Sequence, residues 1–204
     1  MKVDTILAHG TLIVMDDSFT LIKDGALAIV GDKIAAVGVS DQILAEHTAD
    51  QVIDCHNCAI MPGLVNAHTH VPMTLLRGMA DDLRLDVWLM GYMMPVERAF
   101  VNPEFVRIGA MLGCAEMIRS GTTSFADMYY FEDAIAEAVA HAGMRGVLAQ
   151  TVLKFPAPDA ASYEDSIEAC RKFIEKWKGH ALIIPAVGPH AHYTCPPEVL
   201  DACV

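Results

Sequence analysis

The segment MPGLVNAHTH, residues 61–70, decides the fold. Pro62-Gly63 marks a turn, and the apolar run that follows it predicts a strand from Leu64 to His70. Residues two apart on a strand face the same side, so the imidazoles of His68 and His70 are expected to point the same way. Two neutral imidazoles so placed can bind one divalent metal. The bare tripeptide is also typical of a polar strand end, so its context matters.

Downstream of this strand the chain alternates strands with helices. Strands are predicted over residues 122–127, 146–152 and 181–187, and helices over residues 86–99, 102–119, 132–141, 163–178 and from Pro196 onward. This alternation predicts a parallel sheet covered by helices. The two histidines would then end the first strand of a β/α series, which is where barrel active sites are built.

Upstream, residues 2–60 resemble a small all-β unit made of short strands. Gly31-Asp32 joins two apolar runs and predicts a hairpin. We therefore expect a β segment over residues 1–60 and a β/α part over residues 61–204. The second part is too short for a complete eightfold barrel, which needs roughly 250 residues. The chain is expected to be the N-terminal part of a longer protein.

Charge and composition exclude several classes of partner. Twenty-six acidic residues against 14 basic ones leave a net charge of −12, which repels phosphate backbones and argues against nucleic acid. The longest stretch without Asp, Glu, Lys or Arg, Cys55–Leu76, contains histidines and prolines that are costly in a bilayer. No secretion signal accompanies the six cysteines, so we expect reduced thiols in a cytoplasmic protein.

A longer set of motifs carries a family resemblance. The run NAHTHVPMTLLRGMADDL (residues 66–83), then Trp88 and Pro95-Val96-Glu97, resembles the amidohydrolase superfamily. Within it, the chain looks like the 5-methylthioadenosine/S-adenosylhomocysteine deaminase branch, close to the triazine hydrolases. GTT at 121–123, FADMY at 125–129 and GPHA at 188–191 also match. The resemblance implies the N-terminal part of an α/β, TIM-type (β/α)8 barrel, preceded by a small β-sandwich segment.

The resemblance also implies site residues. His68 and His70 match the metal ligands of the first barrel strand. Glu97 matches a residue that holds ribose hydroxyls, and a carboxylate can accept both hydrogen bonds of a diol; the alternative is a solvated helix carboxylate. His190 matches a substrate-contacting histidine at the end of the fourth strand, the alternative being a loop histidine.

Two positions depart from the family pattern. Gln150 stands where many relatives have an Arg and is expected to bind substrate. Arg can clamp a carboxylate bidentately and Gln cannot, so the charged tail of S-adenosylhomocysteine fits less well than methylthioadenosine. His192 stands where a Pro is common, which leaves the shape of that loop open.

The remaining catalytic set of the family lies on later strands. It comprises a third histidine ligand, a proton-shuttling glutamate, a further histidine and a metal-binding aspartate. Two histidines alone cannot hold a catalytic zinc, which usually takes three protein ligands and a water. The resemblance therefore implies no catalytic residue within this chain, and places that set on the later part of the complete protein. Dinuclear relatives use a carboxylated lysine on the fourth strand, and residues 181–190 contain none. One divalent metal ion, zinc, is therefore expected.

The implied activity is metal-dependent deamination of adenosine-type nucleosides, namely 5-methylthioadenosine, S-adenosylhomocysteine or adenosine. Hydroxide activated by the metal would attack purine C6 and give the inosine analogue and ammonia. The setting would be nucleoside salvage, with the complete protein a homo-oligomer. Alternatives are a guanine or other nucleobase deaminase, a triazine-type hydrolase, or a catalytically incomplete fragment.

Two other features are interpreted from the residues alone. Cys55-His56-Asn57-Cys58 lies between predicted strands, without the helix of a redox motif or a second ligand pair for zinc, so it predicts structural thiols. Asp127 ends the second strand of the β/α series, where it could face the site or accept backbone hydrogen bonds. Both interpretations of Asp127 remain open at this point.

Overall fold

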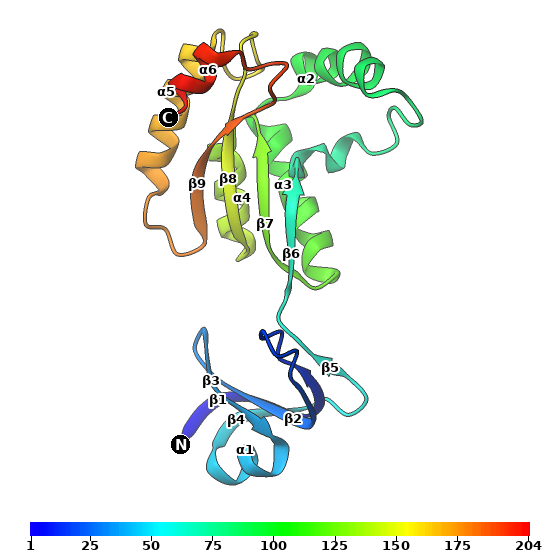
Figure 1. Ribbon diagram of the computed structural model, residues 1–204, viewed down its shortest axis with the longest axis vertical. Helices are drawn as coiled ribbons and strands as arrows, with labels where there is room; N and C mark the ends of the chain where they lie inside the picture. Colours follow the sequence, from blue (N-terminus) through cyan, green and yellow to red (C-terminus); the bar gives the residue numbers. More distant parts are fainter. The chain divides into compact units, whose positions relative to one another are not determined.

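The computed structural model describes residues 1–204 and divides into two compact units, Met1–Pro62 and Gly63–Val204. In chain order the elements are β1 (Lys2–Ile13), β2 (Leu21–Val30), β3 (Lys33–Val39), α1 (Ser40–Glu46), β4 (Thr48–Asp54), β5 (Ala59–Ile60), β6 (Leu64–Thr69), η1 (Val71–Leu76), η2 (Val87–Met93), α2 (Met94–Phe100), α3 (Pro103–Arg119), β7 (Thr122–Tyr129), α4 (Glu132–Ala142), β8 (Arg145–Val152), α5 (Tyr163–Trp177), β9 (Ile183–Pro189) and α6 (Pro197–Ala202) (Figure 1). None of the helices has both the length and the apolar composition needed to cross a bilayer.

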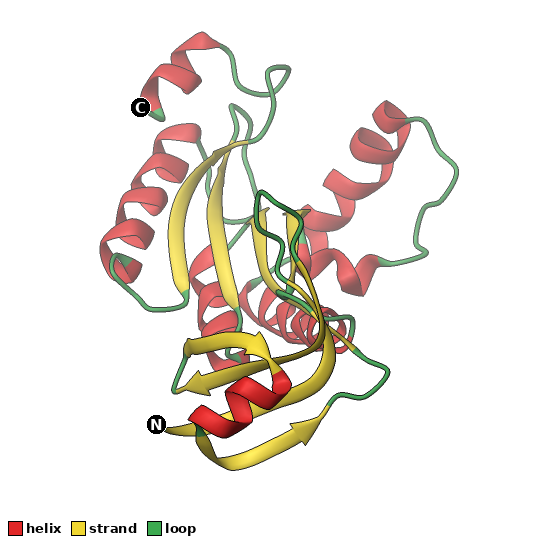
Figure 2. Cartoon of the chain, turned by 60° about the horizontal axis from the view of Figure 1, so that its bottom comes forward, coloured by secondary structure: helices red, strands yellow, loops and turns green.

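The first unit is a five-stranded sheet with one short helix. Its strand order is β3-β2-β1-β4, and β5 also pairs with β1. The predicted hairpin is confirmed, because Val30 pairs with Lys33 and Gly31 takes a φ of 57° in the turn. Figure 2 shows α1 against one face of these strands, where Ile43 packs on Val3, Ile6 and small side chains of β1 and β2.

The expectation of an all-β unit is wrong, because α1 interrupts it. This helix has only seven residues. Ile43 is its one buried apolar residue, and so short a segment cannot display a 3.6-residue period. Its place is decided instead by the apolar face of β1 and β2 on which Ile43 packs.

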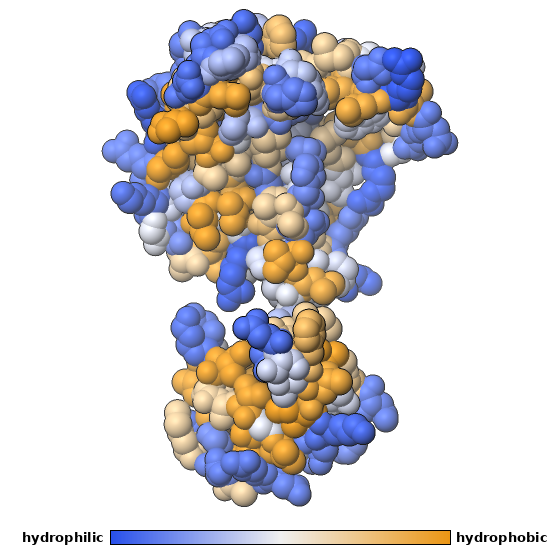
Figure 3. All heavy atoms as spheres, in the orientation of Figure 1, coloured by the Kyte–Doolittle hydropathy of each residue, from blue (hydrophilic) through white to orange (hydrophobic).

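The opposite face of the first sheet carries an apolar row. Strand register puts Ile53, Leu7, Leu27 and Val37 side by side across four strands. Val37 is 43% exposed and Ile53 is 39% exposed, so no layer of this unit covers the row. Apolar surface is plainly visible on this unit in Figure 3.

The second unit is a parallel sheet in the simplest possible order, β6-β7-β8-β9. Helices α3, α4 and α5 connect these strands, and all three pack on one face of the sheet (Figure 1). The large buried side chains of the strands and helices meet there, among them Phe125, Ile135, Leu148, Phe173 and Ile183. The predicted alternation of strands and helices is confirmed.

Local chemistry explains where these helices begin and end. Asn102 caps α3, since its Oδ1 accepts a hydrogen bond from the Phe105 N–H at 3.0 Å, and Pro103 occupies the first turn. Gly143 ends α4 with a φ of 74°, which favours glycine. Gly109 lets η1 approach α3, because a Cβ there would lie 2.5 Å from the Pro72 carbonyl oxygen.

Candidate active site at the carboxyl ends of the parallel strands

A cavity of about 270 Å³ lies at the carboxyl ends of the strands of the second unit. Its polar lining includes the imidazoles of His68, His70 and His190 and the carboxylate of Glu97. The remaining wall is mostly apolar or aromatic, and includes Met73, Leu85, Trp88, Leu89, Met93, Met94, Leu153 and Tyr193. A mostly apolar pocket with a few convergent polar groups is typical of a small-molecule site.

His68 and His70 form the polar centre of the cavity. Their ring centroids are 5.1 Å apart and the rings are nearly perpendicular. Nδ1 of His70 lies 2.7 Å from the Met128 carbonyl oxygen, which can only accept, so Nδ1 carries the proton. Nε2 of His70 therefore keeps a lone pair, the arrangement found in metal-binding histidines. Two neutral imidazoles are suitable donors for zinc, so these residues fit as two of its ligands.

Glu97 projects into the cavity from α2 and is only 5% exposed. Burial raises the pKa of its carboxyl group, while a hydrogen bond from the Tyr129 hydroxyl, at 2.9 Å, opposes that rise. The alternative of a solvated helix carboxylate is therefore wrong. Tyr129 was not expected at the site; its Glu97 partner lies 32 residues away in sequence, so no local pattern could have indicated the contact.

His190 follows β9 and also lines the cavity. Its Nδ1 lies 2.8 Å from the Thr194 hydroxyl, which itself donates to the Ala191 carbonyl at 3.1 Å. Because the Thr194 hydroxyl proton is already donated to Ala191, Nδ1 of His190 donates its own proton to the Thr194 oxygen. Nε2 of His190 is then left as an acceptor. Burial, together with nearby His70, lowers the pKa of His190. His192 is exposed and does not line the cavity.

Comparisons with known proteins identify the family of this chain. The profile of the amidohydrolase family matches residues 59–204. The chain belongs to the amidohydrolase family. The predicted fold class is thereby confirmed: the four parallel strands are the first part of a TIM-type (β/α)8 barrel.

Relatives within the amidohydrolase family are longer than this chain. It is 46% identical to 5-methylthioadenosine/S-adenosylhomocysteine deaminase 1 of Syntrophus aciditrophicus, over 98% of this chain and 45% of that protein. The crystal structure of an adenosine deaminase from Xanthomonas campestris with bound zinc is 35% identical, with a TM-score of 0.96 over 99% of this chain and 46% of that one. A triazine hydrolase from Arthrobacter aurescens shares the fold at 21% identity, with a TM-score of 0.88 over 98% of this chain and 49% of that one.

Gln150 requires a correction. It precedes Thr151 on β8, and since neighbouring strand residues face opposite sides, only Thr151 lines the cavity. Gln150 faces the helices and is 4% exposed. Its Nε2 donates to Asp159 Oδ2 at 2.8 Å, and its Oε1 accepts from the Glu132 N–H at 3.3 Å. It supports the amidohydrolase scaffold and does not contact the cavity.

Asp127 also faces the helix layer, so it accepts hydrogen bonds from the chain and does not face the site. Its Oδ1 accepts from the Thr69 hydroxyl at 2.6 Å and from the Val71 N–H at 2.7 Å. It does not line the cavity. Asp127 thus holds the chain around the end of β6, on both sides of His70.

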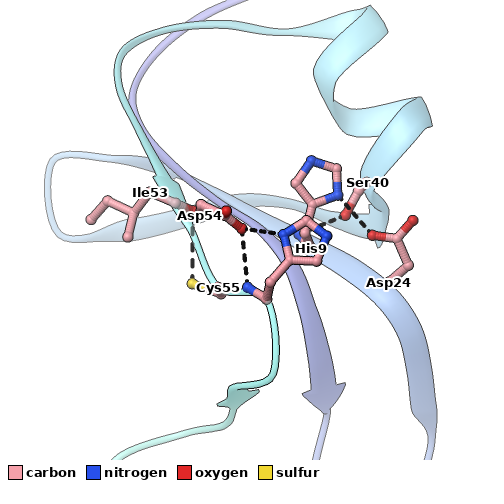
Figure 4. A network of polar contacts seen from close by, with 7 residues as sticks. His9, Asp24, Ser40, Ile53, Asp54 and Cys55 are labelled. Atoms are coloured by element: carbon pink, nitrogen blue, oxygen red, sulfur yellow. Dashed lines mark hydrogen bonds and ion pairs between the residues drawn. The ribbon is translucent and has the colours of Figure 1, made fainter.

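Cys55 and Cys58 belong to a separate network in the first unit. The Cys58 N–H donates to the Cys55 carbonyl in a tight turn, and all six cysteines of the chain are unpaired. Figure 4 shows the neighbouring polar contacts, in which Nδ1 of His9 lies 2.9 Å from Asp24 Oδ1. Residues 1–204 contain no group of three or more His, Cys, Asp or Glu side chains placed to hold a metal.

Proposed function

We propose that the protein is a metal-dependent hydrolytic deaminase of adenosine-type nucleosides, which releases ammonia and leaves the inosine analogue. One observation carries the proposal: the buried carboxylate of Glu97 and the imidazoles of His68 and His70 line the same apolar cavity. A purine nucleoside combines a flat apolar base with a ribose diol, so it matches this lining. The relative from Syntrophus aciditrophicus, which is 46% identical and is named a 5-methylthioadenosine/S-adenosylhomocysteine deaminase, supports the same class of substrate.

The metal would be a single zinc ion held by His68 and His70. When bound, it lowers the pKa of water so that hydroxide is present at neutral pH. His70 is held ready by its bond to the Met128 carbonyl, which leaves Nε2 free. β9 contains no lysine that could bridge a second metal. We propose that the third histidine, the proton-shuttling glutamate and the metal-binding aspartate lie outside residues 1–204, since the chain spans about 45% of its curated relative.

Glu97 and His190 would hold the nucleoside. The ionised carboxylate of Glu97 accepts hydrogen bonds from the two ribose hydroxyls, while the Tyr129 hydroxyl holds one of its oxygens. Nε2 of His190 can accept a further hydrogen bond from the substrate. Because Gln150 does not line the cavity, the residue at position 150 does not decide whether methylthioadenosine or S-adenosylhomocysteine is the preferred substrate.

The experiment that tests this function compares two substrates on the full-length gene product and on its Glu97→Gln variant. The catalytic efficiency kcat/KM towards 5-methylthioadenosine should fall about 10- to 100-fold, because hydrogen bonds to a charged group are weakened. The same parameter for free adenine should change little, since adenine has no ribose. Equal losses for both substrates would contradict the ribose role and favour a nucleobase deaminase or a triazine-type hydrolase.

A catalytically incomplete protein is the alternative from another class. It predicts that the full-length gene product binds no metal and releases no ammonia from methylthioadenosine, S-adenosylhomocysteine or adenosine. Zinc content measured by elemental analysis, together with an ammonia assay, separates this alternative from the proposed deaminase.

The first unit fits a supporting role in the same proposal. We propose that residues 1–60 form a β-sandwich segment, and that the apolar row of Leu7, Leu27, Val37 and Ile53 is its inner face. The complete protein would be a cytoplasmic homo-oligomer in nucleoside salvage. The net charge of −12 carried by residues 1–204 argues against a nucleic-acid partner for this part of the protein.

A further inference from the structure

A buried acidic group lies directly behind the end of β6, on the side of the sheet that faces the helices. Asp127 Oδ1 accepts hydrogen bonds from the Thr69 hydroxyl and from the Val71 N–H. Thr69 and Val71 flank His70 in sequence. One carboxylate oxygen therefore holds the chain on both sides of a histidine that lines the cavity.

A second carboxyl group, that of Glu132, completes the arrangement. Glu132 is fully buried in the first turn of α4, and its Oε1 accepts from the Tyr129 N–H at 2.7 Å. Asp127 Oδ2 and Glu132 Oε2 are both buried without a hydrogen-bond partner. No donor from the rest of the structure reaches either oxygen, and the two carboxyl groups are neighbours. Two ionised carboxylates cannot bond to one another, whereas a single proton between them satisfies both oxygens at once.

We propose that Asp127 and Glu132 share one proton, and that Asp127 is a positioning residue that holds His68 and His70 for the metal. The pair then carries one negative charge, with Glu132 donating and Asp127 accepting. The part that concerns the metal rests on the proposed zinc site, whereas the shared proton does not.

The surroundings of the pair agree with this division of roles. Burial and the nearby Asp127 charge raise the pKa of Glu132 well above its ordinary value. Burial also raises the pKa of Asp127, but the bonds from Thr69 and Val71 oppose that rise. The Glu132 N–H donates to Gln150, whose Nε2 donates onward to Asp159. Asp159 is reached only through Gln150: its Oδ2 accepts from Gln150 Nε2 and from the Phe131 N–H, whereas its Oδ1 is buried without a partner.

The test uses amide substitutions of nearly equal size in the full-length gene product. In Asp127→Asn or Glu132→Gln, the new amide N–H replaces the shared proton and donates to the remaining carboxylate. Each single variant should bind zinc within about threefold of the unsubstituted protein. In the double variant, two N–H groups face each other without an acceptor. Its zinc affinity, measured by competition with a chelator, should fall at least about tenfold.

A second measurement does not depend on zinc. The thermal midpoint of the metal-free protein should fall by more in the double variant than the two single variants predict together. Thr69→Val and Thr69→Ser form a matched pair for positioning, since only Ser keeps the hydroxyl that Asp127 accepts from. Thr69→Val should weaken zinc binding and Thr69→Ser should restore it, whereas a merely structural role would change the thermal midpoint alone.

Two results would overturn the proposal. One is a double variant that binds zinc as tightly as the unsubstituted protein. The other is a single amide variant as weak as the double one, because the remaining carboxylate would then not accept the new donor. If the unsubstituted protein binds no zinc, the metal site fails instead, and the thermal midpoints of the four metal-free proteins still decide whether the pair shares a proton.

Discussion

The two faces of the sheet β6–β9 carry opposite kinds of residue. One face directs His68, His70 and Thr151 towards the cavity. The other packs against helices and buries Leu148 together with polar groups such as Asp127. Since strand residues alternate, neighbours in sequence acquire unrelated roles. The groups that line the cavity therefore come from one face of the sheet, while the other face packs against the helices and holds the chain in place.

The largest expected effect comes from removing a histidine from the cavity face. His70→Ala should lower zinc affinity by more than the roughly 10- to 100-fold that the loss of an outer partner costs, because a ligand itself is lost. The free energy of unfolding of the metal-free protein should change little, since His70 is only partly buried. Elemental analysis and a thermal melt check this. Retention of one zinc per protein would contradict the assignment.

Shortening a buried side chain on the helix face should lower stability and leave zinc binding unchanged. Leu148→Ala should lower the free energy of unfolding by about 2–5 kcal/mol, because it leaves a cavity among fully buried neighbours. The zinc affinity of the folded fraction should stay unchanged. Denaturant titration measures the loss, with exposed Glu175→Ala as a control that should stay within about 0.5 kcal/mol. A zinc defect that exceeds the stability loss would break the comparison between the two faces.

Gln150→Ala tests whether Gln150 supports the scaffold or binds substrate. The change removes partners from Asp159 and from the Glu132 N–H, so it should cost about 1–3 kcal/mol of unfolding free energy. The KM for methylthioadenosine should stay within about twofold, because Gln150 does not line the cavity. A raised KM without a loss of stability would show instead that Gln150 binds substrate.

The smallest expected effect is a pH dependence at Glu97. In the proposed role only its ionised form would accept both ribose hydroxyls, and burial raises the pKa of this carboxyl group above its ordinary value. The KM for methylthioadenosine should therefore rise as the pH falls, beginning at a higher pH than for an exposed glutamate. A Glu97→Gln variant should lack this component of the KM profile. An identical acid limb in both proteins would assign the dependence to another group.

Much of the fold of the second unit follows from local sequence signals. Asn102 and Pro103 mark the start of α3, and Gly143 marks the end of α4, because caps and turns depend on residues a few positions apart. The short helix α1 was not predicted, since seven residues are too few for a clear period. Its formation depends on packing against strands that are distant in sequence.

The site shows the same division. The spacing of His68 and His70 at a strand end predicts a shared direction, and both line the cavity. Glu97 and His190 came from the family resemblance, and the structure brings both to that cavity as well. Gln150 was assigned to the wrong face, since a matching position in a family does not say to which side the side chain points.

By itself, the sequence determined the strand–helix alternation of the second unit, the ends of α3 and α4, the pair of histidines at the end of β6 and the family to which the chain belongs. These features depend on short-range backbone chemistry or on motifs carried by neighbouring residues. Only the tertiary structure decided that Tyr129 bonds to Glu97, that Gln150 faces the helices, and that Asp127 meets Glu132 behind the histidines. Strand register and helix packing bring such groups together, and neither can be read from a single segment of chain.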